Sequence, residues 1–221
     1  KILSGHVSEY AEYTAAGLTV MAVHNHYPKA AVMTGLPDES FIRADIPMTK
    51  REIRASVVSR LSPAKDAIVY DIGAGTGSVS VELAMHALYG TVYAVERTKE
   101  GCELIAQNAR KFGLDNIDII NASAADVIEK LPAADSVFIG GSGGELEKIM
   151  DIVLKKNPGV HIVITAVTLE TLNDSVRLME DKKVDVIDIV QIAVTQIKKR
   201  GRYHMLAANN PVFIIEGRGN R

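Results

Sequence analysis

The sequence has 221 residues, a length for one domain with a short appendage, and 47% of them are apolar and 24% charged. These values exclude a disordered or collagen-like chain. The 25 basic and 27 acidic residues give a formal charge of −2, which argues against a general binder of polyanions such as nucleic acid and leaves a local basic patch open. A single cysteine, no signal segment and no long apolar run predict a cytoplasmic protein that does not enter a membrane.

The beginning of the chain differs in pattern from the rest. Residues 11–17 are weakly helical, and residues 18–23 form an apolar, partly β-branched run typical of a strand. A helix and a strand before a linker make no core of their own, and the chain opens on Lys1 rather than Met. We therefore expect an N-terminal segment, residues 1–35, that is the tail of a preceding domain plus a linker, with an arm that packs elsewhere as the alternative, and a second domain, residues 36–221.

From Met48 onward, the apolar pattern predicts regular elements. Thr49 with Glu52 three residues later has capping-box spacing and predicts a helix that ends at Ser62. Five strands then alternate with five helices: strands at 67–70, 91–95, 117–120, 136–139 and 160–165, and helices at 78–88, 100–112, 125–130, 145–154 and 169–179.

The end of the chain changes character. Residues 184–197 predict one long strand, and residues 211–216 predict another after a polar, basic interruption. The alternation before them implies an α/β fold, a mostly parallel sheet with helices on both faces, and the two last strands predict a C-terminal antiparallel hairpin.

The strongest motif is a glycine loop, DIGAGTGS from Asp71 to Ser78, between the first predicted strand and a helix. In an open α/β sheet this position binds a nucleotide-like ligand, and glycines let the backbone approach it closely. A dinucleotide fingerprint would place its third glycine at position 78, and a Walker loop would need a lysine. The pattern acidic-x-Gly-x-Gly-x-Gly is that of class I methyltransferases, with a Rossmann-like fold, that use S-adenosylmethionine (SAM).

Two later strand ends extend this prediction. Glu96 closes the second strand, where a carboxylate can accept hydrogen bonds from both ribose hydroxyls, although a solvent-facing glutamate is the alternative. Ala124 follows the third strand, where an adenine ring is usually held, although it could equally be loop filler.

The fourth strand ends in a run that normally faces the methyl acceptor: Gly140, Gly141, Ser142, Gly143 and Gly144. It lacks the Asn/Asp-Pro-Pro-aromatic motif expected of adenine amino-methyltransferases. With so few side chains, a large flat acceptor could lie against this backbone, and N–H groups could meet its carboxylates. A flexible turn before a helix is the alternative.

Several segments together resemble the CbiT-type domain, the C-15-methylating, decarboxylating half of precorrin-6Y C-5,15-methyltransferase in cobalamin biosynthesis. The resemblance covers about residues 36–217 and rests on PDESF at 37–41, TKREIR at 49–54, DIGAGTGSVSVE at 71–82, FIGGSGGEL at 138–146, AVTLET at 166–171, RGR at 200–202 and NPV at 210–212. Residues 1–33 resemble the tail of a fused CbiE-type domain, the C-5 methylase partner.

The resemblance implies a SAM-dependent enzyme, a homotetramer, and a precorrin substrate rich in acetate and propionate groups. It implies that the cofactor is bound by Thr49, Asp71, Gly73, Ala74, Gly75, Thr76, Gly77, Glu96 and Ala124. One departure concerns position 123, where the family commonly has Asp and this chain has Ser123, so an adenine-amine bond from an acid there is in doubt. Whether the ring carries cobalt stays open, and the sequence predicts no metal site.

A polycarboxylate substrate predicts arginines at the rim of the site, because a guanidinium binds a carboxylate in bidentate fashion. Arg200 and Arg202, in a basic stretch between the last two strands, and Arg54, on the first helix, are the candidates, with solvated surface residues as the alternative. No catalytic acid or base is evident. The weak candidates are Glu145, Glu170 and His204, for which helix capping, solvation or an incidental loop position are alternatives.

Two other functions compete with a tetrapyrrole methyltransferase. A class I methyltransferase acting on RNA or protein predicts a broad basic face or a recognition domain, and neither is visible at a net charge of −2. A non-catalytic SAM-binding module predicts a degraded cofactor loop, whereas this loop is complete.

Overall fold

The computed structural model describes residues 3–5, 7–10, 12–14, 17, 20–21 and 33–220. The chain divides into two compact units, Lys1–Ala31 and Val32–Arg221. The described part of the first unit contains a short 3-10 helix, Val7–Tyr10. The helix predicted at 11–17 and the strand predicted at 18–23 lie largely outside the described residues.

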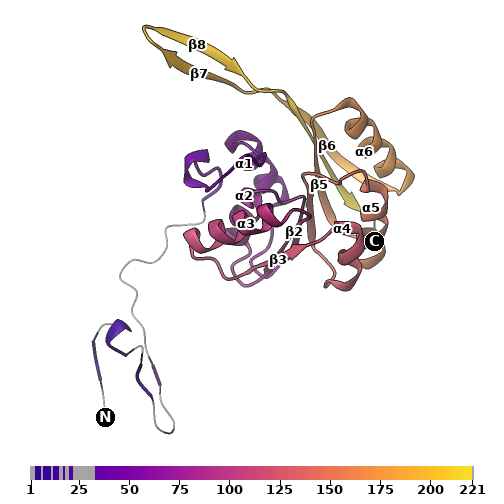
Figure 1. Cartoon of the computed structure of the whole chain (residues 1–221). Helices are drawn as coiled ribbons and strands as arrows, with labels where there is room; N and C mark the ends of the chain where they lie inside the picture. The colour runs from indigo at the N-terminus through magenta and orange to yellow at the C-terminus, as the bar shows by residue number, and fades with distance from the viewer. Residues whose placement is uncertain are drawn as a thin grey trace. The chain divides into compact units, whose positions relative to one another are not determined.

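The second unit is built on a seven-stranded sheet with the order β3-β2-β1-β4-β5-β9-β6 (Figure 1). Its strands are β1 (Ile68–Ile72), β2 (Thr91–Glu96), β3 (Ile117–Asn121), β4 (Ser136–Ile139), β5 (His161–Ala166), β6 (Val184–Ile192) and β9 (Val212–Gly219). β9 runs antiparallel to its neighbours β5 and β6, and the other pairs are parallel. The predicted mostly parallel sheet is therefore confirmed, and β6 runs in the same direction as β1 to β5.

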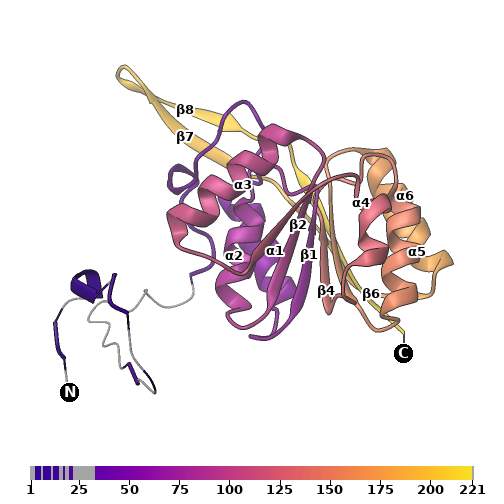
Figure 2. The same cartoon turned by 60° about the horizontal axis from the view of Figure 1, so that its bottom comes forward.

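Helices cover both faces of this sheet, as predicted. One face carries α1 (Arg51–Leu61), α2 (Ser78–His86) and α3 (Lys99–Phe112), and the other carries α4 (Ala124–Val127), α5 (Leu146–Lys156) and α6 (Leu169–Asp181) (Figure 2). Strand residues alternate between the two layers: Val69 belongs to the core cluster that contains Val57 of α1, while the next residue, Tyr70, belongs to the cluster that contains Ile149 of α5. Burying one aliphatic side chain stabilises the folded state by about 1.5–3 kcal/mol. Packing on both faces therefore holds the strands in place, together with the motifs at their carboxyl ends.

The start of α1 differs from its prediction. Lys50, not Thr49, is the N-cap, and no side chain caps the helix. The predicted capping box is thus wrong at this position. The carbonyl oxygen of Thr49 is bound instead by the guanidinium of Arg54, one turn into the helix.

The C-terminal region is more divided than predicted. The expected strand at 184–197 breaks after Ile192 into β6 and β7 (Thr195–Arg200), and the polar interruption forms a further strand, β8 (Tyr203–Ala208). β6 and β9 form the predicted antiparallel pair within the main sheet. β7 and β8 pair with each other around Gly201, which has a positive φ of 60° suited to a tight turn.

We call the β7–β8 ribbon, residues 195–208, the arm. Because β6 runs with the parallel strands, the arm leaves the sheet at the carboxyl edge, the same edge as the glycine loop, and extends away from it (Figure 1). Its apolar side chains are open to solvent, with Ile197 67%, Tyr203 60% and Leu206 75% exposed. No described helix is both long and apolar enough to cross a lipid bilayer.

Candidate cofactor and substrate site

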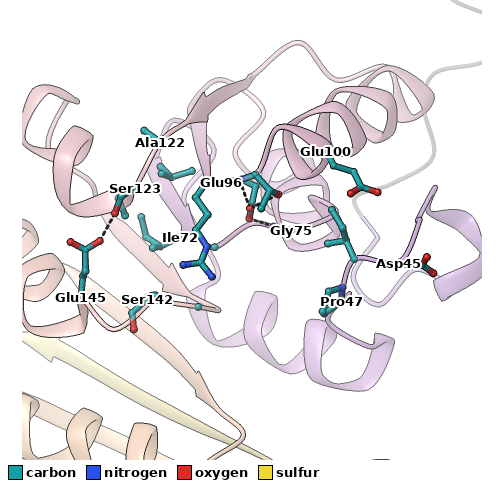
Figure 3. Close-up of a pocket in the computed structure, with 18 residues that line it drawn as sticks. Asp45, Pro47, Ile72, Gly75, Glu96, Glu100, Ala122, Ser123, Ser142 and Glu145 are labelled. Atoms are coloured by element: carbon teal, nitrogen blue, oxygen red, sulfur yellow. Dashed lines mark hydrogen bonds between the residues drawn. The ribbon is translucent and has the colours of Figure 1, made fainter.

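A cavity of about 520 Å³ lies at the carboxyl edge of the sheet (Figure 3). The carboxyl ends of four neighbouring strands and the loops after them line it: Gly73 and Gly75 after β1, Glu96 at the end of β2, Ala122 to Ala124 after β3, and Gly141 to Gly143 after β4. Its size falls in the range of small-molecule sites, and it sits where the strand order reverses. Residues as far apart in sequence as Asp45 and Glu145 therefore face one space.

The glycine loop is shaped by close backbone contacts. Gly73, Gly75 and Gly77 all have positive φ values, between 56° and 74°. A Cβ atom on Gly73 would lie 2.5 Å from the carbonyl oxygen of Gly141, so the loops after β1 and β4 touch through backbone alone. Only glycine fits there, and the result is an open cradle of main-chain groups.

Glu96 ties this cradle to β2. Its side chain accepts hydrogen bonds from the backbone N–H of Gly75 at 3.0 Å and from the N–H and hydroxyl of Thr98, both at 2.8 Å. The residue is 8% exposed and lines the cavity. Its carboxylate is therefore held at a fixed position at the cavity wall.

Behind the loop lie two buried polar atoms without a partner among the described residues: Oδ1 of Asp71 and Oγ1 of Thr76. Burial raises the pKa of Asp71 to about 6; the hydrogen bond from Ser80 lowers it, and the charge of Glu96 raises it further. Neither Asp71 nor Thr76 lines the cavity, so both atoms belong to the polar interior behind the loop. Asp71, Ala74, Thr76 and Gly77 support the loop and do not themselves line the cavity.

The wall opposite to Pro47 is formed by the loops after β3 and β4. The hydroxyl of Ser123 donates to the carboxylate of Glu145, and both residues line the cavity together with Ala124 (Figure 3). Ser123 stands where the family commonly has Asp, but the carboxylate of Glu145, from the loop after β4, lies beside it. Of the three weak catalytic candidates, Glu145 is the one at the cavity.

The loop after β4 reaches the cavity only in part. Gly141, Ser142 and Gly143 line it, whereas Gly140 and Gly144 do not. Thr49 does not line it either, although the nearby residues Asp45, Ile46 and Pro47 do.

Arg54 is placed differently from its prediction. It is fully buried, and its guanidinium binds Glu82, Asp38 and two backbone carbonyls within the chain. The prediction that Arg54 clamps a substrate carboxylate is therefore wrong for this structure, because its charge is neutralised and its donors are occupied by the protein. Arg54, predicted to lie at the rim of the substrate site, lies in the protein interior.

The remaining candidates are exposed and outside the cavity. Arg200 and Arg202 flank the turn of the arm, where Arg202 lies over the ring of Tyr203 at 5.0 Å. His204 is on β8 of the arm, and Glu170 is in the first turn of α6. Within one chain, the structure does not bring these four residues to the cavity.

Sequence reasoning missed Arg97. It lines the cavity directly after Glu96, and a Cβ atom on Gly143 would lie 3.2 Å from its Nη1 atom. No hydrogen bond or ion pair engages its guanidinium within the described part of the chain. The sequence signal that could have identified Arg97 is its position at the carboxyl end of β2, next to Glu96, the predicted partner of the ribose hydroxyls. Residues 45–47 carry no motif, and only the fold brings them to the cavity.

Comparison with known proteins agrees with this geometry. The family model described as "Precorrin methyltransferase domain" matches residues 40–217. A protein of Pyrobaculum calidifontis named "Probable cobalt-precorrin-6B C(15)-methyltransferase (decarboxylating)" is 40% identical over 184 residues, which cover 82% of this chain and 94% of that protein.

Two solved structures are similar over most of the chain. Precorrin-6Y C5,15-methyltransferase of Geobacter metallireducens has a TM-score of 0.79 at 36% identity and covers 86% of this chain and 100% of its own. A precorrin-8W decarboxylase of Methanobacterium thermoautotrophicum has a TM-score of 0.77 at 33% identity and covers 82% and 98%. The chain belongs to the precorrin methyltransferase family.

Proposed function

We propose that the protein transfers a methyl group from SAM to C-15 of a precorrin or cobalt-precorrin macrocycle and removes the carboxyl group of the ring-C acetate as carbon dioxide, a step of cobalamin biosynthesis. The observation that carries this proposal is the single cavity onto which the glycine loop, Glu96 and the loop after β4 all open. Family membership supports the reaction class.

The proposed cofactor contacts follow from that cavity. SAM supplies an electrophilic methyl group. The carboxylate of Glu96, fixed by Gly75 and Thr98, accepts from the ribose hydroxyls. Ala124 lies along the adenine ring, and the Ser123–Glu145 pair offers an acceptor to its amino group. The cradle at Gly73 and Gly75 accommodates the remainder, supported by Asp71 from behind.

The proposed substrate contacts occupy the other side of the cavity. Gly141 and Gly143 present backbone rather than side chains, which lets a flat ring lie close to the transferable methyl group. Arg97 takes the rim position that Arg54 does not, with donors free to bind a substrate carboxylate. Holding the two reactants in line is the main contribution of these residues to the rate.

In the reaction, an electron pair of the macrocycle forms the new carbon–carbon bond at C-15 as the bond from sulfur to the methyl carbon breaks. Loss of carbon dioxide from the acetate returns an electron pair to the conjugated ring, so charge and electrons balance. Because the ring itself is the electron sink, we assign no side chain as base. Glu145, at the cavity wall, orients the adenine side through Ser123 in this account.

We also propose that the arm joins this chain to other copies in a closed homo-oligomer, a tetramer by family resemblance. A two-stranded ribbon alone is marginally stable in water, and the arm exposes large apolar side chains such as Ile197, Met205 and Leu206. Packing against another copy would bury them and would also place Arg200 and Arg202 of the arm near another chain.

The test is to incubate the protein with SAM and with metal-free or cobalt-containing precorrin-6B, and to follow the mass of the macrocycle. We expect a gain of one methyl group with loss of carbon dioxide, and the better of the two substrates identifies the metallation state. SAM binding without either mass change would rule out the proposed reaction.

A further inference from the structure

The segment before α1 forms one wall of the cavity. We call residues 35–49 the strap. Its first residues lie against α2, where the N–H groups of Gly35 and Leu36 donate to Glu82 at 2.7 and 3.0 Å. Its middle residues reach the cofactor cavity, and a Cβ atom on Gly75 would lie 3.2 Å from the carbonyl oxygen of Pro47. The strap therefore crosses directly over the glycine loop.

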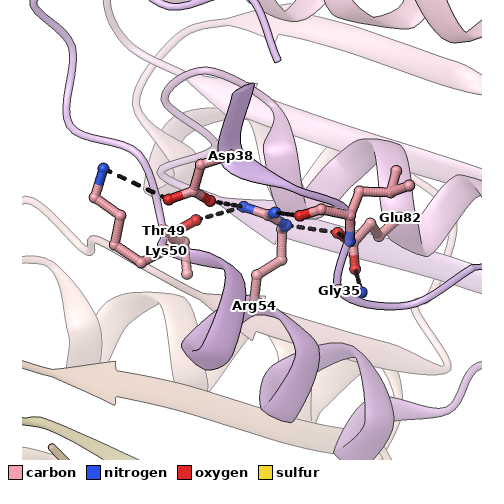
Figure 4. Close-up of polar contacts among 7 residues, drawn as sticks. Gly35, Asp38, Thr49, Lys50, Arg54 and Glu82 are labelled. Carbon is pink, nitrogen blue, oxygen red and sulfur yellow. Dashed lines mark hydrogen bonds and ion pairs between the residues drawn. The ribbon is translucent and has the colours of Figure 1, made fainter. Parts of the chain in front are cut away.

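Arg54 holds both ends of the strap at one guanidinium (Figure 4). Its Nη2 donates to the carbonyl oxygen of Leu36, and its Nη1 donates to Asp38 at 3.2 Å, both at the beginning of the strap. The same Nη1 donates to the carbonyl oxygen of Thr49 at 2.7 Å, at the end of the strap. Chain ends that lie close together define a compact loop, and here one side chain joins them.

Glu82 balances the charge of this arginine. Its Oε1 lies 2.6 Å from Nε of Arg54, and both side chains are fully buried. A buried ion pair adds little stability over a well-packed apolar pair, but leaving one partner unpaired is strongly destabilising. The guanidinium is bound by two carboxylates and two carbonyls, so it holds Leu36, Asp38 and Thr49 of the strap at once.

A second attachment ties the middle of the strap to the glycine loop. Asn108 of α3, fully buried, accepts from the N–H of Ile42 at 2.7 Å and donates to its carbonyl oxygen at 2.9 Å. The same amide donates to the carbonyl oxygen of Thr76 in the glycine loop at 2.9 Å. The ring of Phe41 lies against Arg54, with its centroid 4.5 Å from the guanidinium carbon. Strap and glycine loop are thus one connected structure.

We propose that Arg54 is a positioning residue of the cofactor site. By clasping the two ends of the strap, it fixes residues 45–47 over the glycine loop, so that the cavity wall is formed before SAM binds. The inference rests on the proposed use of SAM, but it assigns to Arg54 a role in cofactor affinity and none in direct contact with cofactor or substrate.

The test compares Arg54→Lys with Arg60→Lys, two charge-conserving changes on the same helix. Lysine keeps the charge beside Glu82 but cannot reach Leu36, Asp38 and Thr49 together. Arg60 is the matched control, because it also bridges two carboxylates, those of Glu216 and Asp188, and does not line the cavity.

Three measurements are made on the full chain: the dissociation constant for SAM by calorimetry, the melting temperature, and hydrogen exchange at residues 45–47. We expect Arg54→Lys to weaken SAM binding about tenfold and to speed exchange at residues 45–47, since the strap must then be ordered on binding. Arg60→Lys should lower the melting temperature while changing SAM affinity less than twofold.

Wild-type affinity in Arg54→Lys, or an equal loss in Arg60→Lys, would overturn the inference. If Arg54→Lys does not fold, Asp38→Asn decides, because it removes one contact at the partly exposed end of the network. We expect Asp38→Asn to weaken SAM binding about threefold, and unchanged binding would overturn the inference. Absence of SAM binding by the wild-type protein would instead contradict the proposed function.

Discussion

The cofactor cavity and the arm lie at the same edge of the sheet but are built in opposite ways. The cavity is made of loops that one chain holds together, with Glu96, Asn108 and Arg54 each buried and hydrogen-bonded. The arm has no interior: every residue of β7 is exposed, and its two strands pair only with each other among the described strands. The difference predicts that one chain is enough to bind the proposed cofactor, whereas the function of the arm depends on what the arm contacts.

The largest effect is expected from charges on the arm. Ile197 and Leu206 face each other across β7 and β8. If another copy covers them, Ile197→Asp combined with Leu206→Asp would place two carboxylates in an apolar interface and weaken association on the order of 1000-fold. Analytical ultracentrifugation measures this change.

The control for the arm is Leu88→Asp, since Leu88 is also an exposed leucine, at 49%, outside the arm. It should leave the oligomer intact. If the arm double variant sediments like the wild type, or if the wild type is a monomer, the arm is no interface. SAM affinity should be the same in all three proteins. A loss of SAM affinity in the arm variant would show that the cavity depends on the arm.

The next effect concerns the buried acid behind the glycine loop. The pKa of Asp71 is about 6 in the folded protein against 3.8 as its ordinary value, so the folded state binds this proton more tightly than the unfolded state. The wild type therefore loses stability from this group as pH rises from about 4 through 6. Two pKa units correspond to about 3 kcal/mol.

Asp71→Asn removes that titration. Between pH 4 and pH 7, its free energy of unfolding should gain up to about 3 kcal/mol relative to that of the wild type. Denaturant unfolding at several pH values measures the difference, and Asp115→Asn, at an exposed aspartate, is the control. Curves for Asp71→Asn and wild type that stay parallel would show that Asp71 is not the group responsible.

A smaller effect separates substrate from cofactor. Arg97→Ala and the double variant Arg200→Ala with Arg202→Ala should each raise KM for the macrocycle about tenfold, because each removes charged donors for a carboxylate. SAM affinity should change less than twofold in both. Equal losses of substrate and cofactor binding in the arm variant would contradict a role of Arg200 and Arg202 in substrate binding.

The smallest effect is expected at Glu170. It is exposed in the first turn of α6 and does not line the cavity. Glu170→Gln should change kcat/KM less than twofold, within the range of ordinary surface substitutions. A loss of tenfold or more in steady-state assays would show that another copy brings this residue to a site.

The part of the fold that follows local pattern could be predicted from the sequence. The predicted ends of β1, β2 and β4, at residues 70, 95 and 139, lie within two residues of the observed ends at Ile72, Glu96 and Ile139, because an apolar strand followed by a glycine loop or an acid is a local signal. The same signals predicted which loops meet at the cavity.

What could not be predicted depends on contacts distant in sequence. Arg54 was read as a rim residue because nothing in its neighbourhood shows that Glu82, 28 residues later, faces it in the interior. The strap carries no motif, and its place over Gly75 results from tertiary packing. β8 lies in the segment that we interpret from the sequence as a polar interruption. A ribbon exposed on both faces needs no alternation of apolar and polar residues, so its sequence does not show the pattern of a strand.

We propose that the carboxyl edge of the sheet binds SAM through Glu96. The most direct test of this proposal is calorimetric titration of SAM into wild type, Glu96→Ala and Glu100→Ala, since both glutamates line the cavity but only Glu96 closes β2 beside the glycine loop. We expect one SAM per wild-type chain, about 100-fold weaker binding in Glu96→Ala, and a change under twofold in Glu100→Ala. Unaltered binding in Glu96→Ala, or equal losses in both variants, would contradict it.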